Sequence, residues 1–223
     1  MVLNLFKNST YLLSVLCITN VLFVIFGLVF SAVQYATKVL KADETFVLLT
    51  YSLTIVTAPC LGAIIGGLVT TKFLGSYKHD NALVLCFIVQ VCFTASCIPC
   101  PFFNDYLPFL VFMWLAAFFQ GFLEPIMMGI ILSSVSEVER SAASSVSILL
   151  EMLFGEFPAP YLYSLVYSST QTLDADGENV SRGGMYTIFF SSFIGLIALA
   201  VALPLRKRSI QGSEKRTRKV IIK

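Results

Sequence analysis

The chain has 223 residues, of which 57% are hydrophobic and 13% are charged, and its formal net charge is +2. Soluble domains contain about 25% charged residues, so this composition excludes an ordinary soluble globular protein. It predicts a polytopic membrane protein, in which the positions of the charges along the chain matter more than their sum.

Six apolar stretches reach the roughly 20 residues that a helix needs to cross a bilayer. They cover residues 11–35, 46–71, 82–101, 107–135, 143–167 and 185–205. Pro59 and three glycines interrupt the second stretch, but membrane helices tolerate such residues when neighbours satisfy the backbone. The sequence therefore predicts an all-α membrane protein with a linker at 1–10, a six-helix bundle at 11–205 and a basic tail at 206–223.

Basic residues are distributed unevenly over the expected loops. Twelve of the 15 Lys and Arg residues fall on the side of the termini, and Lys38, Lys41 and Arg182 fall on the other side. The positive-inside rule then predicts that both termini are cytoplasmic. Asn179 begins the sequon "NVS" on the opposite side and is a glycosylation candidate, whereas the sequon at Asn8 falls on the cytoplasmic side.

Polar side chains share one face of the first span and one face of the fourth span. Asn20 and Gln34 lie on the first, and Gln120 and Glu124 stack with Met128 on the fourth. We expect these four polar residues to line an internal cavity, because ionisable groups inside a bilayer are costly and are a functional hypothesis by default. The alternative is that they serve helix packing through interhelical hydrogen bonds.

The second span carries a series of small residues, Ala58, Gly62 and Gly66, at intervals of four. Such a series is typical of close helix contact. The third and sixth spans carry no charge in their interiors, and the sixth is predicted to face lipid.

The fifth span contains two carboxylates, Glu151 and Glu156. Glu151 shares a face with Ser144 and Ser147 and is a further cavity candidate. Five residues of regular α-helix turn through about 140°, so the two carboxylates should not face one site. We expect Glu156 to take part in a helix–helix hydrogen bond.

The stretch "GEFPAPYLYS" combines Gly155, Glu156, Pro158 and Pro160 inside the fifth span. Two prolines remove two backbone donors, which predicts a bend near the outer half of this helix. Gly155 would allow a neighbouring helix to approach closely. We expect the bend to move during gating.

Other kinds of site find little support in the sequence. Six cysteines lie mostly in apolar runs, and Cys97 and Cys100 have the spacing of a redox or zinc pair without a second ligand pair. Packing cysteines are expected, with a disulfide near the membrane surface as the alternative. No metal, cofactor or nucleic acid is expected, and the absence of catalytic motifs argues against an enzyme.

The six spans, the long loop before the last span and the basic tail resemble the C-terminal half of a major facilitator superfamily transporter. The loop "GGLVTTKFLGSYK" is similar to a degenerate copy of that superfamily's G-x-x-x-D-R-x-G-R signature, with Gly67, Lys72, Gly75 and Lys78 retained and a Thr in the acidic position. The resemblance implies one half of the fold, a 3+3 inverted repeat. It also implies that the first, second, fourth and fifth spans line the cavity, while the third and sixth lie outside.

A second motif resembles the spinster-like branch, which transports lysolipids and sphingolipids. It begins at "EVERSAASS" and continues through "LFGEFPAPYLYSLVYS", and organic-anion transporters have a similar double-proline turn. The matching residues are Arg140, Ser144, Gly155, Glu156, Pro158, Pro160 and Tyr161, while Ser164 replaces a glycine.

These observations predict a secondary active transporter, present as a half or fragment, that moves an amphipathic or organic-anion small molecule by alternating access. Its partners would be the bilayer, a small-molecule substrate such as a lysolipid or organic anion, and either a missing N-terminal six-helix half or a second copy. The expected location is the plasma membrane or an endolysosomal membrane. The alternative is a non-transporting scaffold or pseudo-transporter built from one six-helix half.

Overall fold

The structure is a computed structural model that describes residues 5–6, 8–74, 80–173 and 179–221. Its α-helices are α2 (Ser9–Gln34), α3 (Glu44–Val69), α4 (Asp80–Cys97), α5 (Tyr106–Ser133), α6 (Arg140–Glu151), α7 (Pro158–Ser169) and α8 (Gly183–Ile221). Single π-helical turns cover Tyr35–Val39, Thr70–Leu74 and Met152–Glu156, and short 3-10 turns cover Cys100–Phe102 and Glu137–Glu139. The strands β1 (Thr172–Leu173) and β2 (Asn179–Val180) form a small antiparallel pair between α7 and α8.

Six helical segments of the described chain are long and apolar enough to span a membrane. They are Ser9–Val39, Glu44–Lys72, Asn81–Phe102, Tyr106–Ser133, Glu137–Ser169 and Gly183–Pro204. Each matches one predicted span with ends that differ by a few residues. The prediction of an all-helical, multi-pass membrane protein is confirmed at that level. The backbone of α8 stays helical to Ile221, so the expected boundary at residue 205 is not marked by a break.

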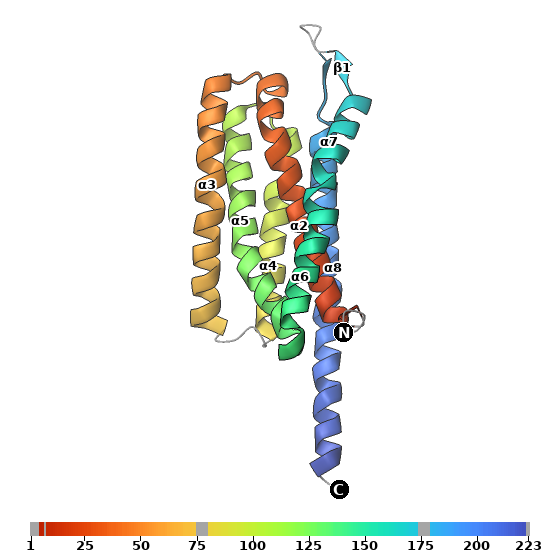
Figure 1. The fold of residues 1–223 in the computed structure, drawn as a ribbon. Helices are drawn as coiled ribbons and strands as arrows, with labels where there is room; N and C mark the ends of the chain where they lie inside the picture. Colours follow the sequence, from red (N-terminus) through yellow and green to blue (C-terminus); the bar gives the residue numbers. More distant parts are fainter. Residues whose placement is uncertain (1–4, 7, 75–79, 174–178, 222–223) are drawn as a thin grey trace.

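The helices run side by side, with α2 in the centre of the bundle (Figure 1). α3 packs mainly against α5, and α4 packs against both α5 and α8. α2 contacts α5, α6, α7 and α8, and α4 and α8 lie behind it in this view. Both termini lie at the same end of the bundle, as an even number of spans requires.

The small residues of α3 bring it close to α5. A Cβ atom at Gly66 would lie 2.6 Å from the carbonyl oxygen of Phe122, and one at Gly62 would overlap the carbonyl oxygen of Phe118. Gly121 of α5 faces the backbone of Pro59 in the same way. The predicted close contact is therefore present, and Pro59 lies inside α3 without ending the helix.

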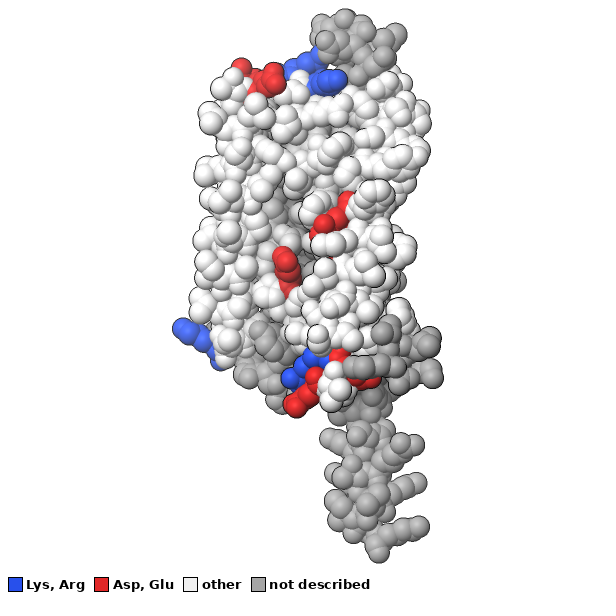
Figure 2. All heavy atoms as spheres, in the orientation of Figure 1, with Lys and Arg blue, Asp and Glu red and all other residues white. Residues whose placement is uncertain are grey.

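Charged side chains gather at the two ends of the bundle (Figure 2). The band between the ends is uncharged in this view except for acidic side chains near mid-height. Large apolar side chains are exposed along this band, for example Leu53, Val56 and Ile64 on α3 and Ile194 and Ile197 on α8. This distribution suits a protein whose outer surface contacts lipid hydrocarbon. The exposed stripe on α8 agrees with the lipid-facing role predicted for the sixth span.

Candidate functional site

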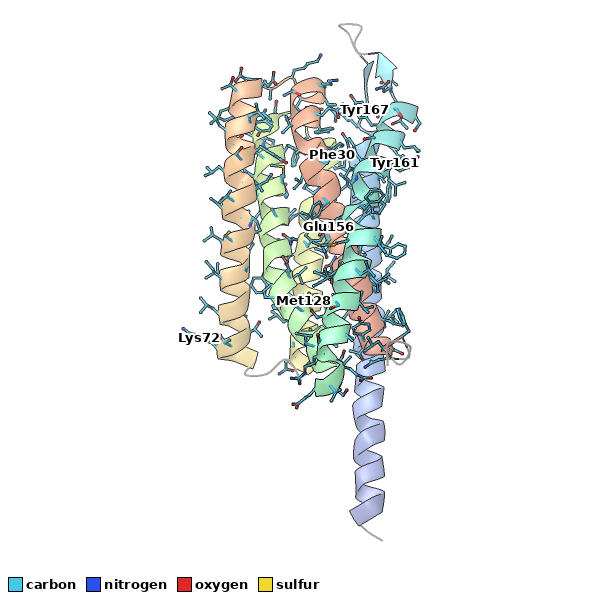
Figure 3. All side chains as sticks on the ribbon, in the orientation of Figure 1. Phe30, Lys72, Met128, Glu156, Tyr161 and Tyr167 are labelled. Carbon is cyan, nitrogen blue, oxygen red and sulfur yellow. The ribbon has the colours of Figure 1, made fainter. Side chains whose placement is uncertain are left out.

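Gln120 and Glu124 lie on one face of α5, as predicted. The Gln120 Nε2 group donates a hydrogen bond to Glu124 Oε2 at 2.9 Å. Gln120 is buried and Glu124 is exposed, and Met128 lies further along the helix (Figure 3). The bond joins two residues of the same helix, so it is not the interhelical packing bond that was the alternative. Glu124 therefore presents its carboxylate to the surface of the bundle in the middle of a span.

Glu151 is buried at the end of α6, next to α2. The Tyr11 hydroxyl of α2 donates to the Ala143 carbonyl oxygen of α6 at 2.9 Å, and Tyr11 is close enough to Glu151 for an electrostatic interaction. Ser147, one turn before Glu151, is also buried. The face predicted to be cavity wall thus packs against α2. Among the described residues, the buried Glu151 Oε1 atom has no hydrogen-bond partner.

A π-helical turn at Met152–Glu156 separates the two carboxylates of the fifth span. The Phe157 N–H donates to the Met152 carbonyl oxygen at 3.0 Å, which closes this wider turn. The 140° separation expected for Glu151 and Glu156 is therefore wrong, because the helix between them is not regular. Glu151 is close enough to both Glu156 and Glu124 to interact electrostatically with them.

Glu156 is half-buried near mid-height of the bundle (Figure 3). It makes no hydrogen bond to another described side chain or backbone group, so the expected helix–helix bond is not observed in this part of the chain. The two carboxylates thus differ from the expectation in their burial. Glu151 is packed between helices, and Glu156 is the more accessible of the two.

Gly155 and the two prolines allow the fifth span to continue past the π-turn. A Cβ atom at Gly155 would lie 2.8 Å from the carbonyl oxygen of Thr19, which confirms the close approach of α2. Phe157 follows the π-turn, Pro158 begins α7, and Pro160 lies in the first turn of that helix, where backbone N–H groups have no carbonyl partner within the helix. The segment is one continuous span, and its irregularity is a π-turn at mid-height. Such π-turns are frequent at functional sites.

We call Glu124, Glu151 and Glu156 the mid-span acidic group. They come from α5, α6 and the π-turn, and Figure 2 shows acidic side chains at this height within an otherwise uncharged face. Lys and Arg residues of the described spans lie at the span ends. The group can hold protons or a cation, or accept hydrogen bonds from a bound molecule.

Asn20 and Gln34, the cavity candidates of α2, do not join this group. Asn20 Nδ2 donates to the Ser191 carbonyl oxygen at 2.8 Å, and the Gly195 N–H donates to Asn20 Oδ1 at 2.8 Å. Its amide therefore bridges two backbone groups one turn apart on α8, which favours the packing alternative. Gln34 is half-buried at the end of α2, away from mid-height.

Two polar residues of α4 were not singled out from the sequence. Gln90 is fully buried, its Oε1 accepts a weak hydrogen bond from the Cys17 thiol, and its Nε2 has no partner among the described residues. Thr94, one turn later, donates to the Ser192 carbonyl oxygen at 3.4 Å. The four-residue spacing of Gln90 and Thr94 places both side chains on one face of α4, and this spacing is the feature of the sequence that points to them. Together with Asn20 they make the interface of α2, α4 and α8 polar.

The residues of the loop motif are only partly brought together. Lys72 is exposed at the end of the second span (Figure 3), and Arg140 lies 3.9 Å from Glu137 in a local ion pair. Gly75 and Lys78 lie outside the described residues.

Two threonines occupy the region in which the resembling signature has an acidic residue. The Thr70 hydroxyl donates to the Gly66 carbonyl oxygen at 2.7 Å, and the Thr71 hydroxyl donates to the Gly67 carbonyl oxygen at 3.0 Å. A Cβ atom at Gly67 would meet nothing within 4 Å. Both hydroxyls are therefore used within their own helix.

The two sequons differ in their surroundings. The Asn8 Oδ1 atom accepts hydrogen bonds from the Thr10 and Tyr11 N–H groups, and its Nδ2 donates to the Ser134 carbonyl oxygen at 2.7 Å. Asn8 is thus engaged as the N-cap of α2. Asn179 pairs with Leu173 through the backbone of β2, and its side chain lies outside the described part of the structure.

All six cysteines are free thiols, including the buried Cys97 and Cys100. The disulfide considered as an alternative is therefore not formed. Within the described residues, no group of three or more His, Cys, Asp or Glu side chains has the arrangement of a metal site.

A scan against protein-family models found no match, and no curated protein sequence matched the chain.

Proposed function

We propose that this chain forms one six-helix half of a secondary active transporter that moves an amphipathic or organic-anion small molecule by alternating access. The observation that carries the proposal is the mid-span acidic group, in which one carboxylate is exposed, one half-buried and one buried. A carboxylate that contacts lipid at the centre of a bilayer is costly. The face that bears Glu124 is therefore expected to line a space that holds water, substrate or another protein surface.

The resemblance to the major facilitator superfamily, and to its spinster-like branch, supports the same proposal. The resemblance implies that the third and sixth spans stand outside the cavity, and here α4 and α8 lie behind α2 (Figure 1). The mid-span acidic group comes from the fourth and fifth spans, which are cavity helices in that superfamily. A second six-helix bundle would cover this face, as another half of the same polypeptide or as a second copy of this chain.

The charge of the mid-span acidic group limits which molecules it can bind. Three neighbouring carboxylates favour a proton, a cation or the cationic portion of a substrate. An anionic substrate would require that the group be protonated or neutralised by a cation during binding. Exposed apolar side chains beside the π-turn, among them Leu153, Phe154 and Phe157, would contact the apolar part of an amphipathic molecule.

The test is uptake of a labelled lysolipid or organic anion into cells or vesicles that contain the protein. Glu124→Gln keeps the shape of the side chain and its contact with Gln120 but removes the charge. We expect uptake to fall about tenfold or more, as for the loss of one positioned acid or base. Glu137→Gln, at an exposed position at the end of the fifth span, is the matched control. Unchanged uptake in Glu124→Gln would remove this carboxylate from the mechanism.

The second candidate function is a non-transporting scaffold or pseudo-transporter. It is favoured by Thr70 and Thr71, whose hydroxyls bond to their own helix where the resembling transporters carry an acidic residue for gating. Measurement of the assembled mass in detergent separates the candidates. A six-span particle that neither self-associates nor supports uptake would favour the scaffold. For the transporter, we also propose a location in the plasma membrane or an endolysosomal membrane, with both termini in the cytoplasm.

A further inference from the structure

A polar cavity lies at the end of the bundle opposite the termini. It has a volume of about 370 Å³, and we call it the basic pocket. It is formed by the turn after α2, the end of α7, the β1–β2 pair and the start of α8. The lining residues are Lys38, Val39, Thr170, Thr172, Ser181, Arg182 and Tyr186. Two of these side chains are cationic and none is acidic.

Arg182 is fixed in position by the connection between α4 and α5. One terminal nitrogen of its guanidinium donates to the Pro101 carbonyl oxygen at 3.3 Å, and the other donates to Asn104 Oδ1 at 2.8 Å. Since a guanidinium has five N–H donors, these neutral acceptors leave most of its hydrogen-bonding capacity unused and give its charge no counterpart among the described residues. The side chain is half-buried, so the uncompensated charge is only partly solvated.

Lys38 supplies the second charge. It is exposed at the π-turn after α2, and its ammonium has no ion pair or hydrogen bond with another described residue. The described acidic residues at this end of the bundle do not line the cavity: Asp43 caps α3 by accepting from the Phe46 N–H at 2.9 Å, and neither Glu44 nor Asp105 is among the lining residues. Asp174, Asp176 and Glu178 lie outside the described residues. In Figure 2, acidic atoms gather over the start of α3, and basic atoms lie beside them at the same end of the bundle.

Two hydroxyl groups of the basic pocket, those of Thr170 and Ser181, are already bonded to the protein. The Thr170 hydroxyl donates to the Val166 carbonyl oxygen at 2.6 Å, and Ser181 Oγ lies 2.6 Å from Thr170 Oγ1. Ser181 Oγ also accepts from the Gly183 N–H at 3.0 Å. The donors that remain for a ligand are therefore the charged ones on Lys38 and Arg182, together with the Tyr186 hydroxyl.

We propose that the basic pocket binds a phosphate-type oxyanion, either the phosphate of a lipid headgroup or that of a soluble phosphate ester. Arg and Lys together provide the charge and the multiple N–H donors that phosphate oxygens accept. The cavity has the size of a headgroup rather than of a whole lipid, and it lies at the ends of the spans, where headgroups are found. The proposal is independent of the mid-span acidic group, so its failure would leave the transporter proposal unaffected.

The experiment measures thermal unfolding of the whole chain in an uncharged detergent while sn-glycerol 3-phosphate is added at constant ionic strength. A second arm compares nanodiscs of phosphatidylcholine with and without phosphatidic acid. Lys38→Met removes one charge from the pocket, and Lys72→Met, an exposed lysine at the other end of the bundle, is the matched control. Arg182→Lys tests the fixed guanidinium while keeping the positive charge.

We expect a saturable rise in Tm with at least one probe, because a ligand that binds the folded state stabilises it. Lys38→Met should weaken the apparent affinity about tenfold, as for a lost hydrogen bond to a charged group, and Lys72→Met should not change it. A response to both probes identifies soluble phosphate esters as ligands, and a response to phosphatidic acid alone identifies a lipid headgroup. No saturable response to either probe, or equal losses in Lys38→Met and Lys72→Met, would overturn the proposal.

Discussion

Gly155 is the residue on which the position of the fifth span against α2 depends. Its missing side chain leaves room for the Thr19 carbonyl oxygen, 2.8 Å from where a Cβ atom would lie. Gly67 offers a contrast, because a Cβ atom there would meet nothing within 4 Å. Both glycines belong to motifs that resemble transporter signatures, but only Gly155 is required by packing.

We predict that Gly155→Val destabilises the folded protein by about 1–3 kcal/mol, the usual cost of forcing extra carbon atoms into a packed interface. Gly67→Ala should change stability by less than about 1 kcal/mol and in the stabilising direction, because alanine favours the helix. Thermal unfolding in detergent measures both. Equal Tm values for the two variants would show that α2 does not approach Gly155 as described.

The fifth span is the element with the greatest local irregularity. Its π-turn at Met152–Glu156 is followed by Phe157 and then by Pro158, whose missing N–H cannot take part in regular α-helical bonding. The π-turn sets the rotation of Glu156 relative to Glu151, and Glu151 is close enough to interact electrostatically with both Glu156 and Glu124. The composition of the mid-span acidic group thus depends on the prolines.

We predict that replacing Pro158 and Pro160 with alanine lowers transport about tenfold while membrane insertion stays normal. The added N–H donors allow a regular helix, in which Glu156 would rotate away from the other two carboxylates. Uptake measures the first effect, and resistance of the membrane-inserted protein to alkaline extraction measures the second. Pro108→Ala, in the first turn of α5, is the control. Normal uptake in the double variant would assign the prolines to packing alone.

At the scale of the whole molecule, the charges define the axis of the bundle. Charged side chains lie at both ends, and the band between them is uncharged on the viewed face apart from its acidic side chains (Figure 2). Both termini lie at one end, and the basic pocket lies at the other. The excess of Lys and Arg on the side of the termini predicts that the end of the bundle with the termini faces the cytoplasm.

We predict that Asn179 is glycosylated and Asn8 is not when the protein is expressed in a eukaryotic cell. Asn179 belongs to the end opposite the termini, and the Asn8 amide is engaged at the N-cap of α2. Asn179→Gln should therefore increase electrophoretic mobility to that of the enzymatically deglycosylated protein, and Asn8→Gln should leave mobility unchanged. The reverse pattern would mean that the orientation is inverted.

Several features of the fold followed from the sequence because they depend on local composition. The six spans were predicted since the thickness of the bilayer sets the length of an apolar run. The small residues Gly62 and Gly66 predicted close packing of α3, and the four-residue interval of Gln120 and Glu124 predicted their shared face. These properties depend only on which side chains are near one another along a single helix.

The tertiary structure decided what each polar face contacts. Asn20 and Glu124 look alike in the sequence, as polar residues on otherwise apolar helices, but Asn20 bonds to the backbone of α8 and Glu124 stays exposed. The basic pocket joins Lys38 to Arg182 across most of the chain. The sequence alone determined the spans and their polar faces, because hydrophobic length and helical periodicity are local. Only the packed bundle decided which carboxylates meet and which cations share a cavity, because the free energy of burying a polar group depends on the partner that packing provides.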